Sequence, residues 1–578
     1  MDKKIIISAL LTLSASTYTP LIHATTLVAP KDAYKAVLSL YAYNSQGKLL
    51  RKGTAVYVDA KGNAVTSYSL LKGAEHAEVV DAKGKKYAIK RILGANATTD
   101  LVKFSIDGVT KNEYFDITTS AAPQGSSLQL LHYTTNKKAF MPSILVESQE
   151  PYNDYAYYHI SATNDSINFS CPIIDANGYL VAFVQRNVEK NATGACAIDA
   201  RFVQQLNIKA TSAFDADLNA LRIPRALPAD KAEANSYLDL LARMGQVDSA
   251  LCVTAFNDFI TSYPEMPDGY VYRGSYWANK NELGKANADF ELAVEKSMSC
   301  KDSTALSPDA VHYTLSNLIY RKVVAAGKDS TFSHNWNLAR AEQEADLAYA
   351  AKPYTLYLVQ KGNCQYANHN YKGAFESFEK ACQDKRFVSS ETYFSAAKSL
   401  EMAKGDNHKV LTLLDSCIAY VPEHASAAYG QYYLERSQRL IQAERYREAV
   451  ADYNKYEQLI GPRNLNEQFY DLRSQAEEKA HMYQQALDDL HTAIAITKQP
   501  LPYKIDEAAL LLNIGEYKRA ITSAQEVLKQ LPNNADCLKI TGVAYGELKQ
   551  KALALQFLNK AKAAGDKSVD AFIDKYSK

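Results

Sequence analysis

Two kinds of hydrophobic pattern divide the chain. Between residues 30 and 210, short segments alternate apolar and polar positions, as in Ala36–Tyr43, Thr54–Val58 and Ala77–Val80, and turns with Gly or Asn separate them. Closely spaced segments of this kind predict the strands of a β-barrel or sandwich. From residue 231 to the end, apolar positions follow the period of a helix instead. The chain is therefore expected to be multidomain, with an all-β domain followed by an all-α region.

The helical region repeats itself at a fixed period. Small residues stand 34 residues apart at Ser474, Ala508 and Gly542. Twelve residues after each comes an alanine, and seven further on another apolar residue: Ala486, Ala520 and Ala554, then Ala493, Val527 and Ala561. The same frame fits two earlier segments, with a Phe between the alanines: Gly274, Ala286, Phe290 and Ala293, and Gly362, Ala374, Phe378 and Ala381.

This pattern resembles the tetratricopeptide repeat (TPR), a 34-residue helix-turn-helix whose small residues let two helices approach closely. Weaker units surround the clear ones: one ends at Pro264, one spans about 305–353, one ends at Pro422, and one carries Ala449 and Tyr453. The resemblance implies about nine hairpins in residues 231–578, stacked as a superhelix with a concave face that binds proteins or peptides.

The inner helix of each hairpin lines the concave face of such an array. On that geometry we expect seven residues to be candidates for the binding groove: Ser275, Asn279, Asn363, Tyr366, Gln475, Glu478 and Lys539. A solvated surface position is the competing interpretation for each of them.

Three segments of the first domain resemble trypsin-like serine proteases of the HtrA type. Gly53–Val56 with Gly62–Thr66 is similar to the strand pair that precedes the catalytic histidine, and Thr99–Phe104 to the segment that holds the acidic residue. Asn168–Ile174 is similar to the nucleophile loop. The resemblance implies a trypsin-like double β-barrel over residues 30–210.

The catalytic positions depart from that family. Ser69 stands at the histidine position, Asp100 keeps the acidic residue, and Phe169 stands where the nucleophile belongs. Ser170 and Cys171 replace the glycines of the oxyanion loop. A triad needs a nucleophile, a base within hydrogen-bonding reach and an acid that orients the base. With two of the three missing, we expect a pseudoenzyme in which Asp100 is a structural turn residue.

Two alternatives to a non-catalytic scaffold remain open. Ser170 could act as a shifted nucleophile of a serine endopeptidase, with His76, His132 or His159 as the base. The chain could also be a glycan- or ligand-binding component of a cell-envelope complex. Its 40 Tyr against 18 Phe would then provide stacking platforms for sugar rings.

The N-terminus has the pattern of a secretory signal peptide. Lys3 and Lys4 precede an apolar run, Ile5–Leu13, and Ala24 offers a small residue for cleavage. We therefore expect residues 1–24 to be removed and the protein to act in the periplasm or outside the cell. Pro224 and Pro228, among alanines and charged residues, predict a linker over residues 211–230.

Composition and the remaining motifs narrow the function further. A net charge of +1 argues against nucleic-acid binding, and no apolar run is long enough to span a membrane permanently. The eight cysteines form no CxxC motif, and neither a phosphate loop nor HExxH occurs, so we expect no metal and no cofactor. Two pairs are candidates for disulfides, with buried free thiols as the alternative: Cys171 with Cys196, and Cys364 with Cys382.

Overall fold

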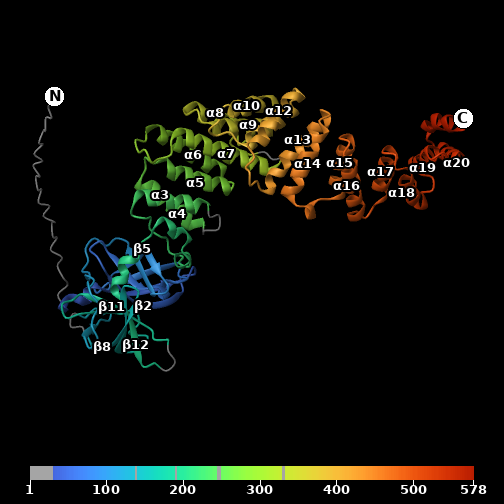
Figure 1. The fold of residues 1–578 in the computed structure, drawn as a ribbon. Helices are drawn as coiled ribbons and strands as arrows, with labels where there is room; N and C mark the ends of the chain where they lie inside the picture. Colours follow the sequence, from blue (N-terminus) through green and yellow to red (C-terminus); the bar gives the residue numbers. More distant parts are fainter. Residues whose placement is uncertain (1–29, 137–139, 189–191, 244–248, 328–331) are drawn as a thin grey trace, which may run out of the picture. The chain divides into compact units, whose positions relative to one another are not determined.

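The computed structural model describes residues 30–136, 140–188, 192–243, 249–327 and 332–578. The expected signal peptide, residues 1–24, lies outside the described residues. The chain divides into two compact units, residues 1–307 and 308–578. The first unit contains the β domain and the first helices, and the second contains helices alone (Figure 1).

The β domain consists of two closed antiparallel barrels of six strands each, which is the trypsin-like double barrel. Alternating burial along the strands, as in Leu101–Ile106, places one face of each strand in a barrel core. The first barrel has the order β1-β2-β3-β6-β5-β4: β1 (Val37–Tyr43), β2 (Leu49–Tyr57), β3 (Asn63–Ser67), β4 (His76–Val80), β5 (Lys86–Asn96) and β6 (Leu101–Ile106).

The second barrel has the same number of strands and a matching order, β10-β11-β12-β9-β8-β7. A shared apolar cluster joins the two barrels, with Val56 and Val65 from the first against Phe183 and Ile198 from the second. The strands of the second barrel are β7 (Ser127–Leu130), β8 (Ser143–Tyr152), β9 (Tyr155–Thr163), β10 (Pro172–Ile174), β11 (Leu180–Gln185) and β12 (Gly194–Asp199).

Residues 211–230, expected to form a linker, are folded onto the first barrel. After η2 (Ala200–Gln205), they contain most of η3 (Ala210–Phe214) and all of α2 (Ala216–Asn219). The backbone N–H of Ile92 on β5 donates to the carbonyl of Pro224 at 2.8 Å, and Leu221 and Ile223 are buried. The segment is therefore part of the packed first unit.

One hydrophobic core extends from the first barrel into the first helices. Leu40 and Phe104 of the barrel belong to the same cluster as Tyr237, Phe256 and Phe259 of the helices. Arg91 on β5 also forms a bidentate ion pair with Asp258, at 2.7 and 2.9 Å. The barrel and the first helical hairpins consequently pack as one body.

In the described residues, nineteen helices follow, and eighteen of them pair as nine antiparallel hairpins, as the sequence predicts (Figure 1). They are α3 (Lys231–Arg243), α4 (Ser249–Ser262), α5 (Pro267–Asn279), α6 (Leu283–Ser299), α7 (Pro308–Ala326), α8 (Leu338–Ala351), α9 (Thr355–Ala367), α10 (Tyr371–Cys382), α11 (Ser390–Met402), α12 (Asn407–Ala419), α13 (Gly430–Gln442), α14 (Tyr446–Ile460), α15 (Glu467–Lys479), α16 (Tyr483–Ile496), α17 (Leu501–Asn513), α18 (Tyr517–Gln530), α19 (Ala535–Glu547), α20 (Lys551–Ala563) and α21 (Asp570–Ser577).

The repeated small residues lie where the two helices of a hairpin touch. A Cβ at Gly362 would come within 2.8 Å of the Phe378 ring, and one at Gly542 within 2.8 Å of Leu558. A larger residue at either position would push the helices apart. This contact explains the 34-residue pattern of small residues in the sequence.

Candidate functional site

The histidine and aspartate positions of the expected triad lie together in the first barrel. Ser69 is on the short helix α1 (Tyr68–Leu71), and Asp100 precedes β6. The Ser69 N–H donates to Asp100 Oδ1 at 2.7 Å, and its hydroxyl donates to Oδ2 at 3.2 Å. The carboxylate that would orient a histidine therefore binds a serine, which cannot act as a base near neutral pH.

Asp100 holds an uncommon backbone conformation, with φ at +49°. Burial raises the pKa of its carboxyl, while the hydrogen bonds from Ser69 act in the opposite direction. Asp and Asn adopt positive φ more readily than most residues. The side chain thus has a structural use here, since it accepts the hydrogen bonds of the α1 turn.

Ser170 is held by the first barrel through its side chain. Only 1% of the residue is exposed, and φ is +61°. Its hydroxyl donates to the Thr54 carbonyl at 2.9 Å and accepts from the Thr54 N–H at 2.9 Å. The hydroxyl hydrogen therefore bonds to a backbone carbonyl and not to a base.

Phe169 occupies the position expected for the nucleophile. The ring is half-buried, packs against the core of the first barrel, and has the Arg186 guanidinium 5.9 Å from its centroid. This side chain offers an apolar and aromatic surface, with no group that can attack a carbonyl.

The three histidines considered as alternative bases have other partners. His132 Nε2 lies 2.9 Å from Asn168 Oδ1, and the His76 ring stacks on Tyr43 with centroids 5.0 Å apart. His159 lies 3.4 Å from a carboxylate oxygen of Glu150. The hydrogen bonds found for the Ser170 side chain in the described part of the chain go to the backbone of Thr54 alone.

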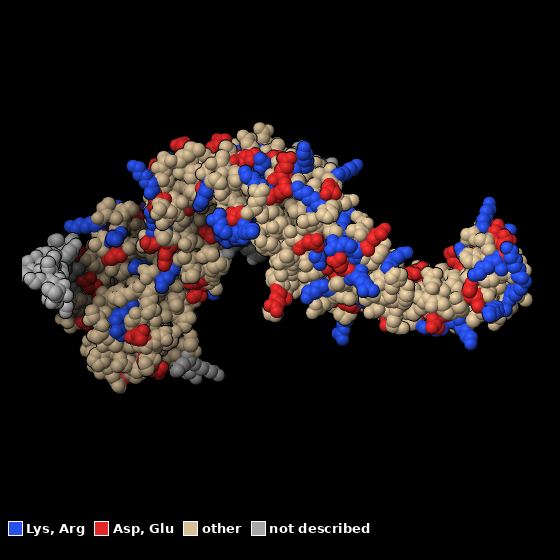
Figure 2. Space-filling view, turned by 45° about the horizontal axis from the view of Figure 1, so that its top comes forward, with Lys and Arg blue, Asp and Glu red and all other residues tan. Residues whose placement is uncertain are grey.

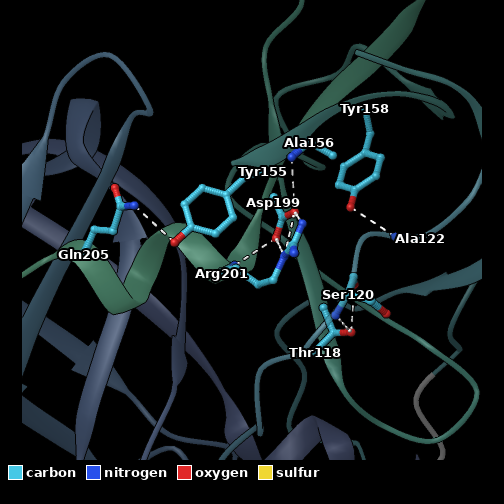
Figure 3. A network of polar contacts seen from close by, with 9 residues as sticks. All are labelled: Thr118, Ser120, Ala122, Tyr155, Ala156, Tyr158, Asp199, Arg201 and Gln205. Carbon is cyan, nitrogen blue, oxygen red and sulfur yellow. Dashed lines mark hydrogen bonds and ion pairs between the residues drawn. The ribbon is translucent and has the colours of Figure 1, made fainter. Parts of the chain in front are cut away.

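A buried carboxylate that the sequence did not single out lies in the second barrel. Asp199, at the end of β12, is 0% exposed and accepts hydrogen bonds from the Arg201 side chain and from the Ala156 N–H at 3.2 Å (Figure 3). Nearby, Gln205 donates to the Tyr155 hydroxyl at 3.1 Å. Because Asp199 is already paired, the network fixes β9, β12 and η2 together. In the sequence this network corresponds only to the run Asp199-Ala200-Arg201, which matches no known motif pattern considered above.

The expected disulfides do not form in the structure, in which all eight cysteines are described and none is bridged. Cys171 Sγ lies 3.6 Å from Thr54 Oγ1, and Cys196 Sγ lies 3.7 Å from His159 Nδ1. Cys364 accepts from Gln360 at 3.5 Å, and burial raises the pKa of its thiol to about 12. Cys171 and Cys364 are buried free thiols in the structure, which was the alternative to the disulfides.

Among the seven groove candidates, Asn363 lines a cavity. This cavity measures about 420 Å³ and lies between the first helices of two successive hairpins, α9 and α11. Leu356 and Phe387, which are 42% and 47% exposed, line it together with Tyr354. Sequence reasoning missed these three residues. Leu356 is an apolar residue in the first turn of α9, whereas Tyr354 and Phe387 are aromatic residues that precede α9 and α11.

The other six candidates do not line this cavity, and four of them contact residues of their own or a nearby element. Ser275 is half-buried and Asn279 is exposed on α5. In the second unit the contacts are Tyr366 with the Tyr371 ring at 5.3 Å, Gln475 with Asp471 at 3.0 Å, Glu478 with Asn513 at 3.0 Å, and Lys539 with Ser568 at 2.5 Å. Of the five candidates in the second unit, only Asn363 therefore lines the cavity between α9 and α11.

Surface charge and metal ligands give no further site. On the face drawn in Figure 2, acidic and basic side chains are interspersed over most of the surface, and a group of basic side chains lies at the C-terminal end. In the described residues, His, Cys, Asp and Glu form no group of three that could hold a metal ion. None of the described helices is both long and apolar enough to cross a membrane.

Comparison with known proteins gives no relative: no protein-family model matches the sequence, and no curated protein matches it.

Proposed function

We propose that the chain is a non-catalytic interaction scaffold of the periplasm or the cell exterior. In this proposal an inactive trypsin-like double barrel is joined to a TPR-type array that binds peptide segments of other proteins. The observation that carries the first part is the pair of hydrogen bonds between Ser170 and the Thr54 backbone. A nucleophile must instead present its hydroxyl to a base and to the substrate.

The pseudoenzyme part rests on two further contacts. Ser69 uses the Asp100 carboxylate, and the Phe169 ring fills the nucleophile position. Restoring chemistry at this site would require a new base, a new nucleophile and a different loop backbone. The serine endopeptidase alternative therefore has little geometric support.

The binding part rests on the cavity between α9 and α11. Leu356, Phe387 and Tyr354 offer apolar surface to a side chain of the partner, and the Asn363 amide can both donate to and accept from an extended backbone. Pockets that combine an apolar lining with a few polar groups are the usual binding sites of proteins. A peptide with a large apolar side chain is the ligand that fits this lining best.

Photo-crosslinking in cells tests the binding part. A photoreactive amino acid at position 363 should crosslink a defined partner, and the same amino acid at Glu376, which is exposed on α10, is the matched control. Adding Leu356→Ala should reduce the crosslink at position 363. Equal crosslinking from both positions, or none from position 363, would reject this face as the binding site.

A fluorophosphonate probe tests the pseudoenzyme part separately. We expect no covalent labelling of the full chain, because the probe reacts with activated serines. Labelling that disappears in Ser170→Ala would establish the hydrolase alternative.

A further inference from the structure

Arg225 is a buried cation whose neighbours leave its charge unbalanced. The residue is 8% exposed and follows the β domain, just before α3. Its Nη2 donates to Asn219 Oδ1 at 2.6 Å, and its Nη1 lies 3.5 Å from the Ser212 carbonyl and from the Tyr237 hydroxyl. All three acceptors are neutral. In the ranges that the structure describes, no carboxylate pairs with this guanidinium.

The Nε–H group of Arg225 is the unused donor. It is buried and has no hydrogen-bond partner. A buried charge normally requires a partner of opposite charge, and a buried donor requires an acceptor. A water molecule would satisfy the donor alone, whereas a bound anion would satisfy the donor and balance the charge.

The available space limits which anion fits. A cavity of about 10 Å³ lies beside Arg225, lined also by Tyr237, Leu241, Leu251 and Ala255. This volume corresponds to one water-sized sphere. Phosphate, sulfate and carboxylate ligands are therefore too large. A monatomic anion such as chloride, which is somewhat larger than water, fits when the partly exposed Leu251 side chain moves outward.

The Arg225 charge is the part of the lining that favours an anion. Leu241, Leu251 and Ala255 provide an apolar wall, and attraction between opposite charges is stronger in such low-dielectric surroundings. The Tyr237 hydroxyl accepts from Arg225 Nη1 and retains its own hydrogen for donation. The site thus offers two donors, one of them charged.

We propose that this cavity binds a chloride ion, held by Arg225 Nε–H and the Tyr237 hydroxyl. The cavity joins three parts of the first unit: the segment after the β domain, which supplies Arg225, then α3 with Tyr237, and α4 with Leu251. Bound chloride would stabilise the junction between the barrel and the helical repeats, independently of any partner on the concave face.

Hydrogen exchange of the full chain tests the proposal locally. Amides of α3 should exchange about tenfold more slowly when chloride is tenfold above its dissociation constant than in gluconate at equal ionic strength. Arg225→Met should abolish this difference. Arg243→Met is the control: it removes a cation of α3 whose side chain is 76% exposed, and the effect of chloride on exchange should remain.

Bromide provides a readout that does not depend on a variant. Crystals of the full chain grown in bromide should show an anomalous peak within hydrogen-bonding distance of Arg225 Nε. A water molecule without anomalous signal at that place would overturn the proposal. Chloride protection of α3 that persists in Arg225→Met would overturn it as well.

Discussion

Arg473 of α15 donates to both carboxylate oxygens of Asp489 on α16, at 2.7 and 2.8 Å, and both side chains are buried. The pair connects the two helices of one hairpin across sixteen residues of sequence. The same separation recurs in two other hairpins, as Arg273 with Asp289 and Arg436 with Asp452. The repeat thus has a polar signature in addition to its small residues.

Removing one partner of this pair should weaken the hairpin. Asp489→Ala removes one of the two carboxylate partners of the buried Arg473 and leaves Glu457. A fully uncompensated buried charge costs about 3–5 kcal/mol, so we expect the free energy of opening to fall by no more than this amount. Hydrogen exchange of α15 and α16 amides measures this. Asp570→Ala removes an exposed partner of Lys562 and should change the value by less than about 1 kcal/mol. Equal losses of opening free energy in Asp489→Ala and Asp570→Ala would show that the buried Arg473–Asp489 pair stabilises the hairpin no more than an exposed pair does.

The stability of the same hairpin, α15 with α16, should depend on pH through Glu477. Burial, reinforced by the negative charge of Asp489, raises the pKa of this carboxyl to about 8. The folded pKa of Glu477 lies above its ordinary value of 4.5. The contribution of the protonated Glu477 to hairpin stability is therefore fully present below pH 4.5 and is lost as the pH rises toward 8.

Glu477→Gln tests this dependence, because glutamine has nearly the same shape and does not ionise. We expect it to stabilise the hairpin by roughly 2–4 kcal/mol near pH 9 and to have little effect near pH 4. Hydrogen exchange of the α15 and α16 amides between these two pH values gives the stability of the hairpin as a function of pH. A variant with the same pH dependence as the natural chain would exclude Glu477 as its source.

Ser170 should contribute to stability and not to catalysis. Ser170→Ala leaves the buried N–H of Thr54 without its acceptor, and we expect a loss of about 1–3 kcal/mol in the free energy of unfolding of the first unit. Ser170→Gly also loses the hydrogen bonds but suits the positive φ of this position. The alanine variant should therefore be the less stable of the two in denaturant titrations.

Asp100 allows a comparison of side-chain size and charge. Asp100→Asn keeps one acceptor oxygen and tolerates φ of +49°, whereas Asp100→Ala loses both advantages. We expect the alanine variant to be less stable by about 1–2 kcal/mol than the asparagine variant. Similar stabilities in thermal unfolding would mean that the hydrogen bonds to Ser69 contribute little.

The helices were predictable because their contacts repeat. Gly362 and Gly542 touch Phe378 and Leu558, so the spacing of small and large residues reflects direct packing. The turns of the hairpins were less visible. His481, Gly515 and Lys549 are 34 residues apart and all have positive φ, yet only one of them is glycine. Backbone geometry of this kind leaves no uniform residue type in the sequence.

The β domain was predictable as a fold, and its chemistry only in part. The motifs singled out Ser69 and Asp100 as degenerate triad positions, but the hydrogen bonds between them were not part of the prediction. The roles of Arg225 and Asp199 depend on partners far away in sequence or on a cavity, which no local pattern shows. Residues 211–230 looked like a linker because of their prolines, but Leu221 and Ile223 pack into the core.

The common core of the barrel and the first helices also makes the barrel a cap for one end of the repeats. In a stack of repeats each unit buries its apolar faces against its neighbours, and the ends need protection from solvent. The barrel covers the first helices at Tyr237 and Phe256, so it protects this end of the helical region from solvent. An insertion before α3 would therefore expose the apolar faces of α3 and α4 that the barrel now covers.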